Sequence, residues 1–588
     1  MSNAVATSKR SAILYSRSSF ITYFYSMLLV YFTIDWYFFE KSISLFNGLI
    51  YSNINNIIII FFIFILSFFI IILTSFYPVN MVQNTNINEM DLIDSLNNSE
   101  NRENIFFNIY PIRDAEPKDI FQIERDHYKI IEYPLIIQFI IIGGITLLSS
   151  NDLITIFLCI ELQSYGLYIL SAIYRNSESS TGAGLTYFLL GGLSSCIILL
   201  GLSFLYINSG TTSLDSLYLI YNIITSDDNL LSIFYSHASV FNNELNDNGL
   251  SLFSLNYYQY SIQFSLVVLC VGFLFKISAA PFHSWSPGVY DAIPTVTTTF
   301  VAIIPKISIL TLLFDLVYST WYTTFNYSWT SILLFSSFLS LVIGSILGLT
   351  QYKIKRLYAY STISHVGFIL LALSVHSVES IQAFFFYIIQ YSLSNLNAFF
   401  ILIVIGYTYT NYYKKTEGYD SISSLYKKYK GKINELSPIE YIDNLKGYFY
   451  LNPILAISLS VTLYSFIGVP PLVGFFAKQM VLSSALDNGD IFICLVAILT
   501  SVISAVYYLY IVKHMFFEKS NYNLNLSVSR ISKWEGEEKN NKANTNVITL
   551  SSWLTISISI LSLTMLLFIF LYHEIYFLMN IISILLIY

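Results

Sequence analysis

Charged residues are scarce in this chain, making up 11% of its 588 residues, whereas hydrophobic residues make up 55%. A soluble domain carries about 25% charged residues, so the composition excludes an ordinary globular enzyme. Cysteine is also rare: each of the four stands alone in a hydrophobic run. That placement excludes a CxxC metal site and a disulfide framework.

Other absences narrow the class of function. The sequence contains no GxGxxG, Walker-type loop or HExxH motif, so nothing in it predicts a bound nucleotide, flavin, haem, metal or iron–sulfur centre. It also has no long basic stretch, and we expect no nucleic acid partner. The net charge of −7 says little, because most acidic residues lie in polar segments.

Long apolar runs dominate what is present. The run Asn56–Tyr77 contains no charged residue and is long enough to cross a hydrocarbon core of ~30 Å. Lipid offers the backbone no hydrogen-bond partner, so such a run must be helical. We predict an all-α polytopic membrane protein, with the tail Glu574–Tyr588 too short to span. The thirteen expected spans are 19–38, 55–77, 133–150, 153–174, 184–207, 261–280, 292–318, 328–350, 357–375, 380–409, 453–480, 490–513 and 551–572.

Positive charge alternates between successive loops. Lys or Arg occurs in 1–18, at Arg175, and in 351–356, 410–452 and 514–550, but not in 150–152, 208–260, 319–327, 376–379 or 484–490. The positive-inside rule therefore predicts an inner N-terminus and an outer C-terminus, with Lys41 as the exception. The basic, serine-containing start leaves a targeting segment open as an alternative. Abundant Tyr and Phe fit the AT-rich codons of an organelle genome.

Two charged residues fall in the middle of predicted spans. Glu161 lies within 153–170, and Lys306 follows Pro305 deep in its own span. Ionised side chains at the bilayer centre cost roughly 2.5–3.5 kcal/mol, so each needs a partner, water or a function. The alternatives are a protonated Glu161 bonded to a neighbouring helix and a Lys306 that serves packing only.

Two further lysines accompany proline breaks. Lys276 precedes Pro281, and Lys478 follows Pro470 and Pro471. Proline inside a span breaks the helix, and broken helices expose backbone dipoles beside ion sites. The stretches 272–276 and 474–478 also resemble each other, which indicates an internal repeat. The alternative for both lysines is a side chain that reaches the membrane surface.

Weaker candidates complete the set. His365 lies within a span and has an unperturbed pKa of ~6.5, so it is a candidate proton relay, although packing explains it equally well. We expect His283 to face the inner surface, Lys513 to reach the surface from a helix end, and the Lys355–Arg356 pair to be an inner-surface anchor.

One acid and three lysines on successive spans resemble the antiporter-like subunits of respiratory complex I, and among them the chain 2 (bacterial subunit N) group in a fungal mitochondrial style. The resemblance covers most of 133–513. It is carried by Asp152–Leu170, Lys276–Lys306, Lys355–Phe368 and Gly468–Lys478. Chain 4 relatives typically carry Glu where this chain has Lys478, and chain 5 relatives end in a long lateral helix that this tail does not show. Two departures are Gly288, where the family commonly has Asp, and a count of thirteen spans where fuller members have fourteen, so that the first family helix is not recognised here.

The resemblance implies two inverted repeats of about five helices, at 133–318 and 328–513, each with one Pro-broken helix. Residues 1–132 would add about two helices and a polar loop, and 514–588 a polar loop and a last helix. Glu161 and Lys276 would form the family's Glu–Lys pair, with Lys306 the central and Lys478 the terminal proton-relay lysine.

The implied function is proton translocation in the mitochondrial inner membrane, driven by NADH-to-ubiquinone electron transfer in other subunits of the oxidoreductase. NADH, FMN, iron–sulfur clusters and ubiquinone would belong to those subunits. The implied partners are the other membrane-arm subunits, neighbouring antiporter-like subunits among them, and the lipid bilayer. A cation/proton antiporter subunit is the main alternative. A purely structural subunit and a quinone-binding subunit are weaker ones.

Overall fold

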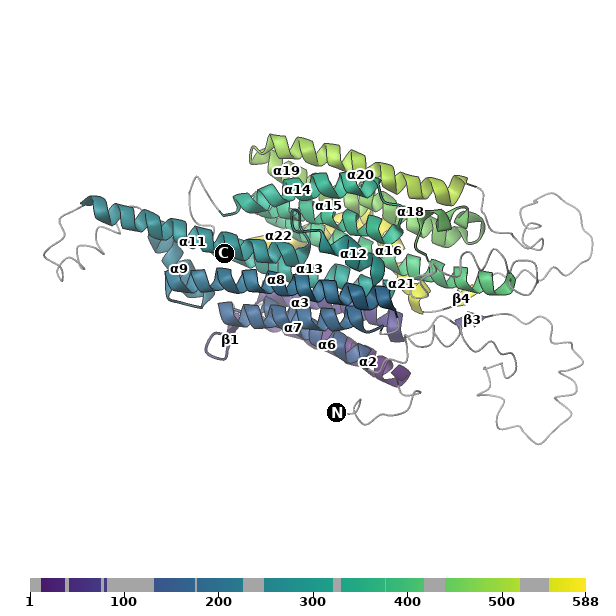
Figure 1. Ribbon diagram of the computed structural model, residues 1–588, viewed down its shortest axis with the longest axis horizontal. Helices are drawn as coiled ribbons and strands as arrows, with labels where there is room; N and C mark the ends of the chain where they lie inside the picture. The colour runs from purple at the N-terminus through teal and green to yellow at the C-terminus, as the bar shows by residue number, and fades with distance from the viewer. Residues whose placement is uncertain are drawn as a thin grey trace, which may run out of the picture.

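The computed structural model describes residues 12–37, 42–75, 79–81, 132–174, 177–225, 248–320, 329–375, 377–416, 439–518, 549–551 and 553–587. These residues form a helical bundle with a few short strands (Figure 1). Up to the first broken helix the elements are α2 (Ala12–Tyr37), β1 (Ser42–Leu45), β2 (Ile50–Asn53), α3 (Ile54–Ser75), β3 (Val79–Met81), α6 (Tyr133–Leu148), α7 (Leu153–Ala172), α8 (Glu178–Ser209), α9 (Leu214–Thr225) and α11 (Asn248–Ile277). The remainder are α12 (Trp285–Ala292), α13 (Thr295–Thr320), α14 (Ser331–Leu349), α15 (Ile354–Ser374), α16 (Val378–Thr416), the 3₁₀ turns η1 (Ile442–Leu445) and η2 (Tyr448–Tyr450), α18 (Pro453–Ile467), α19 (Val473–Asp487), α20 (Ile491–Phe517), β4 (Thr549–Ser551), α21 (Trp553–Leu566) and α22 (Phe568–Ile587).

The chain is a multi-pass membrane protein. Nine described helices are long and apolar enough to cross a bilayer, or ten if the bent pair α21 and α22 counts as one span. Three shorter apolar helices lie at Ser18–Ile34, Tyr133–Leu148 and Pro453–Ile467. Together they place a helix in every one of the thirteen predicted spans, although helix boundaries differ by several residues.

The two ends of the bundle carry different charges. At the acidic end, the hairpin β1–β2 meets 149–152, and Asp152 pairs with Ser213. At the basic end, Lys353 pairs with Tyr441, and Gly447 donates to the His514 carbonyl. The charged residues described at the acidic end are all acids, namely Asp152, Asp215, Glu379, Asp487 and Asp490. The cations Lys353, Arg356, Lys446 and Lys513 lie at the basic end, together with acids such as Asp291 and Asp443. This asymmetry matches the loop pattern from which the topology was predicted.

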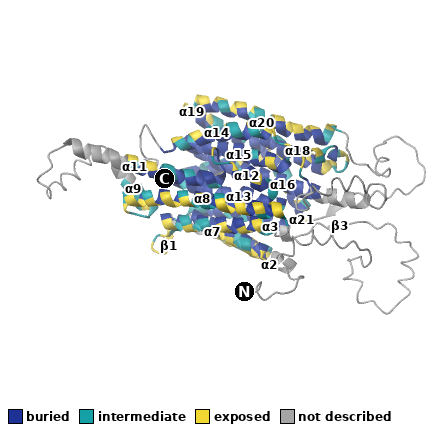
Figure 2. Ribbon diagram, in the orientation of Figure 1, coloured by how far each residue is buried: buried dark blue, intermediate teal, exposed yellow. Residues whose placement is uncertain are grey.

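Three helices form the centre of the bundle. In the apolar, membrane-length stretch of α13 and of α15, 94% of the residues are buried, and in that of α16 89% are buried. The corresponding shares are only 33% in α8 and 39% in α20. Figure 2 shows the buried helices in the middle and the exposed faces on the outer ones. Exposed apolar side chains on α8 and α20 are the expected lipid-facing surface.

Both predicted breaks are visible in the chain. α11 ends at Ile277 and α12 begins at Trp285, with Pro281 between them. α18 ends at Ile467, Gly468 adopts a left-handed φ of 86°, and α19 begins after Pro470 and Pro471. A glycine in this conformation ends a helix without a steric penalty from Cβ. The similar stretches 272–276 and 474–478 lie on opposite sides of their breaks, one before and one after.

The shape predicted for the last span is wrong. The expected straight helix 551–572 ends at Leu566, and α22 continues from Phe568 at an angle of 81°. The tail from Glu574, expected to be too short to span, belongs to this twenty-residue helix. Phe568 packs on Phe386 and Phe476, and Gln382 donates to Ser583 Oγ at 3.2 Å. These contacts with α16 and α19 hold α22 across the bundle.

Candidate functional site

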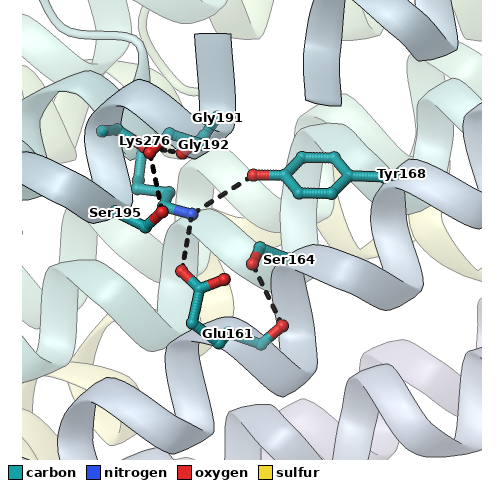
Figure 3. A network of polar contacts seen from close by, with 8 residues as sticks. Glu161, Ser164, Tyr168, Gly191, Gly192, Ser195 and Lys276 are labelled. Atoms are coloured by element: carbon teal, nitrogen blue, oxygen red, sulfur yellow. Dashed lines mark hydrogen bonds and ion pairs between the residues drawn. The ribbon is translucent and has the colours of Figure 1, made fainter. Parts of the chain in front are cut away.

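Glu161 and Lys276 come together from α7 and α11. Lys276 Nζ lies 3.6 Å from Glu161 Oε1, and the two side chains are only 8% and 13% exposed. Lys276 also donates to the Tyr168 hydroxyl at 3.3 Å. Figure 3 shows the ammonium between these two oxygens, with Ser164 bonded to the Glu161 carbonyl. The pair expected from sequence is thus formed, with a tyrosine that sequence analysis did not single out.

Lys306 lies on the central helix α13 and is 2% exposed. Its ammonium donates to Thr362 Oγ1 on α15 at 3.2 Å and stands 5.7 Å from the centroid of the Tyr290 ring. Among the described residues, no carboxylate lies within 4 Å of this nitrogen. A buried cation held only by a hydroxyl and a ring face is weakly compensated, which is the arrangement expected of a group that gains and loses a proton.

His365 follows Thr362 by one turn on α15. Its Nδ1 is 2.9 Å from the Tyr387 hydroxyl, while its buried Nε2 has no hydrogen-bond partner among the residues that the structure describes. The imidazole packs against the Phe466 ring, with centroids 5.1 Å apart. Buried polar atoms nearly always have partners, so a free imidazole nitrogen at this depth is notable.

Lys478 lies on α19 just beyond the second break. Its ammonium donates to the Phe466 and Ile467 carbonyls, both at 2.9 Å, and lies 5.4 Å from the Phe368 ring centroid. These carbonyls belong to the last turn of α18, where helix geometry leaves them without partners. The helix break therefore supplies the oxygens that hold the lysine.

We refer to these five groups together as the buried polar file: Glu161, Lys276, Lys306, His365 and Lys478. Helix α15 links the last three groups, Lys306, His365 and Lys478. Its residues Thr362, His365 and Phe368 recur at three-residue spacing and so share a face. Glu161, Lys306 and His365 each lie near the middle of their helices. The file therefore crosses the bundle at about constant depth.

Sequence analysis missed or misplaced three polar residues that lie within helices. The expected surface anchor Lys355 is instead buried, 2% exposed, and donates to the Ile293 carbonyl at 2.6 Å, while its neighbour Arg356 is the exposed one. Successive helix positions point about 100° apart, so the two could not face the same way. Asp315, a carboxylate two to three turns beyond Lys306 in an apolar run, was not considered. Tyr168 was hidden among the many tyrosines.

The two remaining weak candidates are His283 and Lys513. His283 lies in the first break, half-buried, with Nδ1 3.3 Å from the Pro281 carbonyl. This partial burial lowers its pKa below the usual 6.5. Lys513 is exposed on α20 near the basic end, as expected.

Residues 150–504 match the family model described as the NADH:quinone oxidoreductase/Mrp antiporter transmembrane family. The chain belongs to this family. The match runs from α7 to about the middle of α20 and so includes the whole buried polar file.

Individual members of the family are also similar in sequence. The chain is 47% identical over 387 residues to the NADH-ubiquinone oxidoreductase chain 2 of Rhizopus oryzae, a match that covers 66% of this chain and 64% of that protein. It is 34% identical to the NADH-quinone oxidoreductase subunit N of Pelagibacter ubique, over 66% of this chain and 70% of that protein.

Solved structures of the same fold come from two kinds of complex. A chain of respiratory complex I from Thermus thermophilus superposes with a TM-score of 0.60 at 20% identity, covering 96% of this chain and 93% of that one. A chain of the Mrp complex from a Dietzia species superposes with a TM-score of 0.66 at 15% identity, covering 99% and 93%. These similarities establish the antiporter-like fold alone.

Proposed function

We propose that this chain is a proton-translocating membrane subunit of respiratory complex I in the mitochondrial inner membrane. The observation that carries the proposal is Lys306, a buried ammonium at the centre of the bundle with no described carboxylate beside it. The similar proteins named chain 2 and subunit N support assignment to an NADH:quinone oxidoreductase.

The mechanism starts at the Glu161–Lys276 pair. Electron transfer and quinone chemistry take place in other subunits, and their energy reaches this one as an electrostatic or conformational change that separates the pair. Without the carboxylate, the protonated Lys276 is less favourable and its proton passes to Lys306, then by way of Thr362 and His365 to Lys478. His365 suits this step because Nε2 is free to bond.

The energies involved are compatible with this scheme. Moving one charge against 100 mV takes ~2.3 kcal/mol. A tenfold change in proton affinity corresponds to ~1.4 kcal/mol, so a change of roughly fiftyfold at one lysine is enough. Moving a carboxylate away from a buried ammonium changes its proton affinity by this order.

Partners and cofactors follow from the same proposal. The chain would contact other membrane-arm subunits, including neighbouring antiporter-like subunits. NADH, FMN, the iron–sulfur clusters and ubiquinone would bind elsewhere in the complex, and this chain would do no redox chemistry itself.

Lys306→Ala tests the proposal in the assembled complex. We expect proton pumping and coupled NADH oxidation both to fall at least tenfold, because the central proton-accepting group is gone, while the complex still assembles. Pumping is followed by quenching of a pH-sensitive dye in sealed vesicles, with NADH oxidation measured in parallel. Lys513→Ala, an exposed lysine, is the matched control and should pump normally. Normal pumping per NADH in Lys306→Ala would mean that the lysines are structural.

The second candidate is a self-contained cation/proton antiporter, favoured by the likeness to the Mrp complex. It predicts cation-driven proton movement in vesicles that contain this chain without NADH or quinone. The complex I proposal predicts none.

A further inference from the structure

Lys276 has two oxygen partners rather than one. The Tyr168 hydroxyl is 3.3 Å from Nζ, closer than Glu161 Oε1 at 3.6 Å, and the Tyr168 ring centroid is 5.8 Å away. N–H···O hydrogen bonds span about 2.7–3.2 Å, so the ammonium is fully bonded to neither group. Tyr168 follows Glu161 by two turns of α7 and so lies on the same face.

The hydroxyl has its place because residue 191 has no side chain. A Cβ built on Gly191 of α8 would lie 1.9 Å from Tyr168 Oη and 2.8 Å from Cε1. The next residue, Gly192, differs completely, since a Cβ there meets nothing within 4 Å. Gly191 is thus required for the position of the hydroxyl, and Gly192 is not.

The Tyr168 ring is connected to both sides of the first helix break. It packs edge-on against Tyr187, with centroids 4.9 Å apart, and Tyr187 stacks on Trp285 at 4.7 Å. Trp285 is the first residue of α12, and its indole donates to the Phe275 carbonyl at 3.0 Å. Phe275 directly precedes Lys276, so a movement of α12 would reach the lysine and its tyrosine together.

We propose that Tyr168 is a positioning residue of the buried polar file, with its hydroxyl the neutral acceptor that keeps the Lys276 ammonium when Glu161 moves away. The inference rests on the proposed function and names a further member of its first step. A carboxylate binds the proton through its charge, whereas a hydroxyl solvates the ammonium without charge. The ammonium can therefore leave Glu161 without becoming an isolated buried cation, and its proton then departs to the next group. Tyr168 keeps its own proton throughout.

Tyr168→Phe tests this directly, because it removes the hydroxyl and keeps the ring. We expect coupled NADH oxidation and pumping to fall roughly three- to tenfold, the effect of losing one hydrogen bond of ordinary strength, because this contact is long at 3.3 Å; the amount of assembled complex should be normal. Gly191→Ala should produce a similar loss by displacing the hydroxyl. The matched controls are Tyr165→Phe, an exposed tyrosine of the same helix, and Gly192→Ala, and both should pump normally.

Glu161→Gln separates positioning from packing. With the carboxylate neutralised, the hydroxyl becomes the main acceptor, so Tyr168→Phe should cause a larger fold-loss in the Glu161→Gln background than alone. Equal fold-losses in both backgrounds would show that the hydroxyl acts independently of Glu161 and would overturn the inference.

Two further outcomes separate the inference from the function on which it rests. Wild-type rates in Tyr168→Phe together with a loss of pumping in Lys276→Ala would refute the role of the tyrosine alone. Normal pumping in Lys276→Ala would refute both. If Gly191→Ala fails to assemble, the comparison of Tyr168→Phe in the two backgrounds still decides.

Discussion

Each buried lysine in the file is bound by a different set of oxygens. Lys276 has a carboxylate and a hydroxyl, Lys306 a hydroxyl, and Lys478 two backbone carbonyls. The residue types could be predicted, because a charge inside an apolar run is conspicuous. The partner of Lys306 could not, since Thr362 lies in a helix 56 residues farther along the chain. The carbonyls that bind Lys478 lie just before the break that proline predicts.

His365 offers a test at the same scale. In His365→Leu we expect pumping to fall several-fold without loss of assembly, because Nε2 is lost from the path between Lys306 and Lys478 and leucine suits the surrounding aromatic rings. Dye quenching and NADH oxidation, measured in parallel, again give the ratio of protons pumped to NADH oxidised.

Tyr387→Phe is the control for that experiment, since it removes only the partner of Nδ1. We expect a smaller effect than that of His365→Leu. A His365→Leu complex with the wild-type ratio and rate would assign the histidine to packing.

At the scale of elements, the short helix α12 is fixed by the loop that precedes α15. Lys353 Nζ and Arg356 Nε both approach Asp291 Oδ2, at 2.9 and 3.0 Å, and Lys355 donates to the Ile293 carbonyl. Cations at a helix C-terminus also interact favourably with its dipole. The basic residues predicted as a surface feature thus tie the first break to the helix that carries Thr362 and His365.

Asp291→Asn should loosen this attachment. The carboxylate is 12% exposed but its partners are 28% and 45% exposed, so we expect a loss of about 1–2 kcal/mol, discounted for solvent screening. The measurement is the temperature at which pumping is lost on heating, which should fall.

Asp443→Asn provides the comparison, because that carboxylate is 68% exposed in its pair with Lys446. It should leave the temperature of inactivation unchanged. Equal effects of the two substitutions would contradict a special role for the α12 attachment.

The positions of the prolines were enough to predict the two helix breaks. The bend between α21 and α22 could not be predicted. Residues 553–587 contain no proline and only one glutamate, so composition favours a straight span. The bend reflects contacts with α16 and α19, which are tertiary. The inverted relation of the two repeats stays a prediction.

At the scale of the whole molecule, apolar runs were enough to place the helices, because a bilayer leaves the backbone few options. The order of packing was not predictable. Hydropathy does not identify the central helices, because α20 is more apolar than α13, α15 and α16 and yet faces outward.

The topology predicts opposite accessibility of the two ends. With exposed Cys196 replaced by serine, a cysteine introduced by Tyr352→Cys should react with an impermeant maleimide only from the side of the basic loops. One introduced by Asn488→Cys should react only from the opposite side. Both native side chains are exposed. Labelling of both from one side would refute the alternating arrangement.

The constant depth of the buried polar file has an electrical consequence. A proton passed from Lys276 to Lys306, His365 and Lys478 would travel parallel to the membrane plane and so cross almost none of the transmembrane voltage. The work done against the field would then be confined to the steps that load and empty the file. Lateral transfer would proceed at a rate indifferent to the voltage, and only entry and exit would slow as the membrane becomes energised.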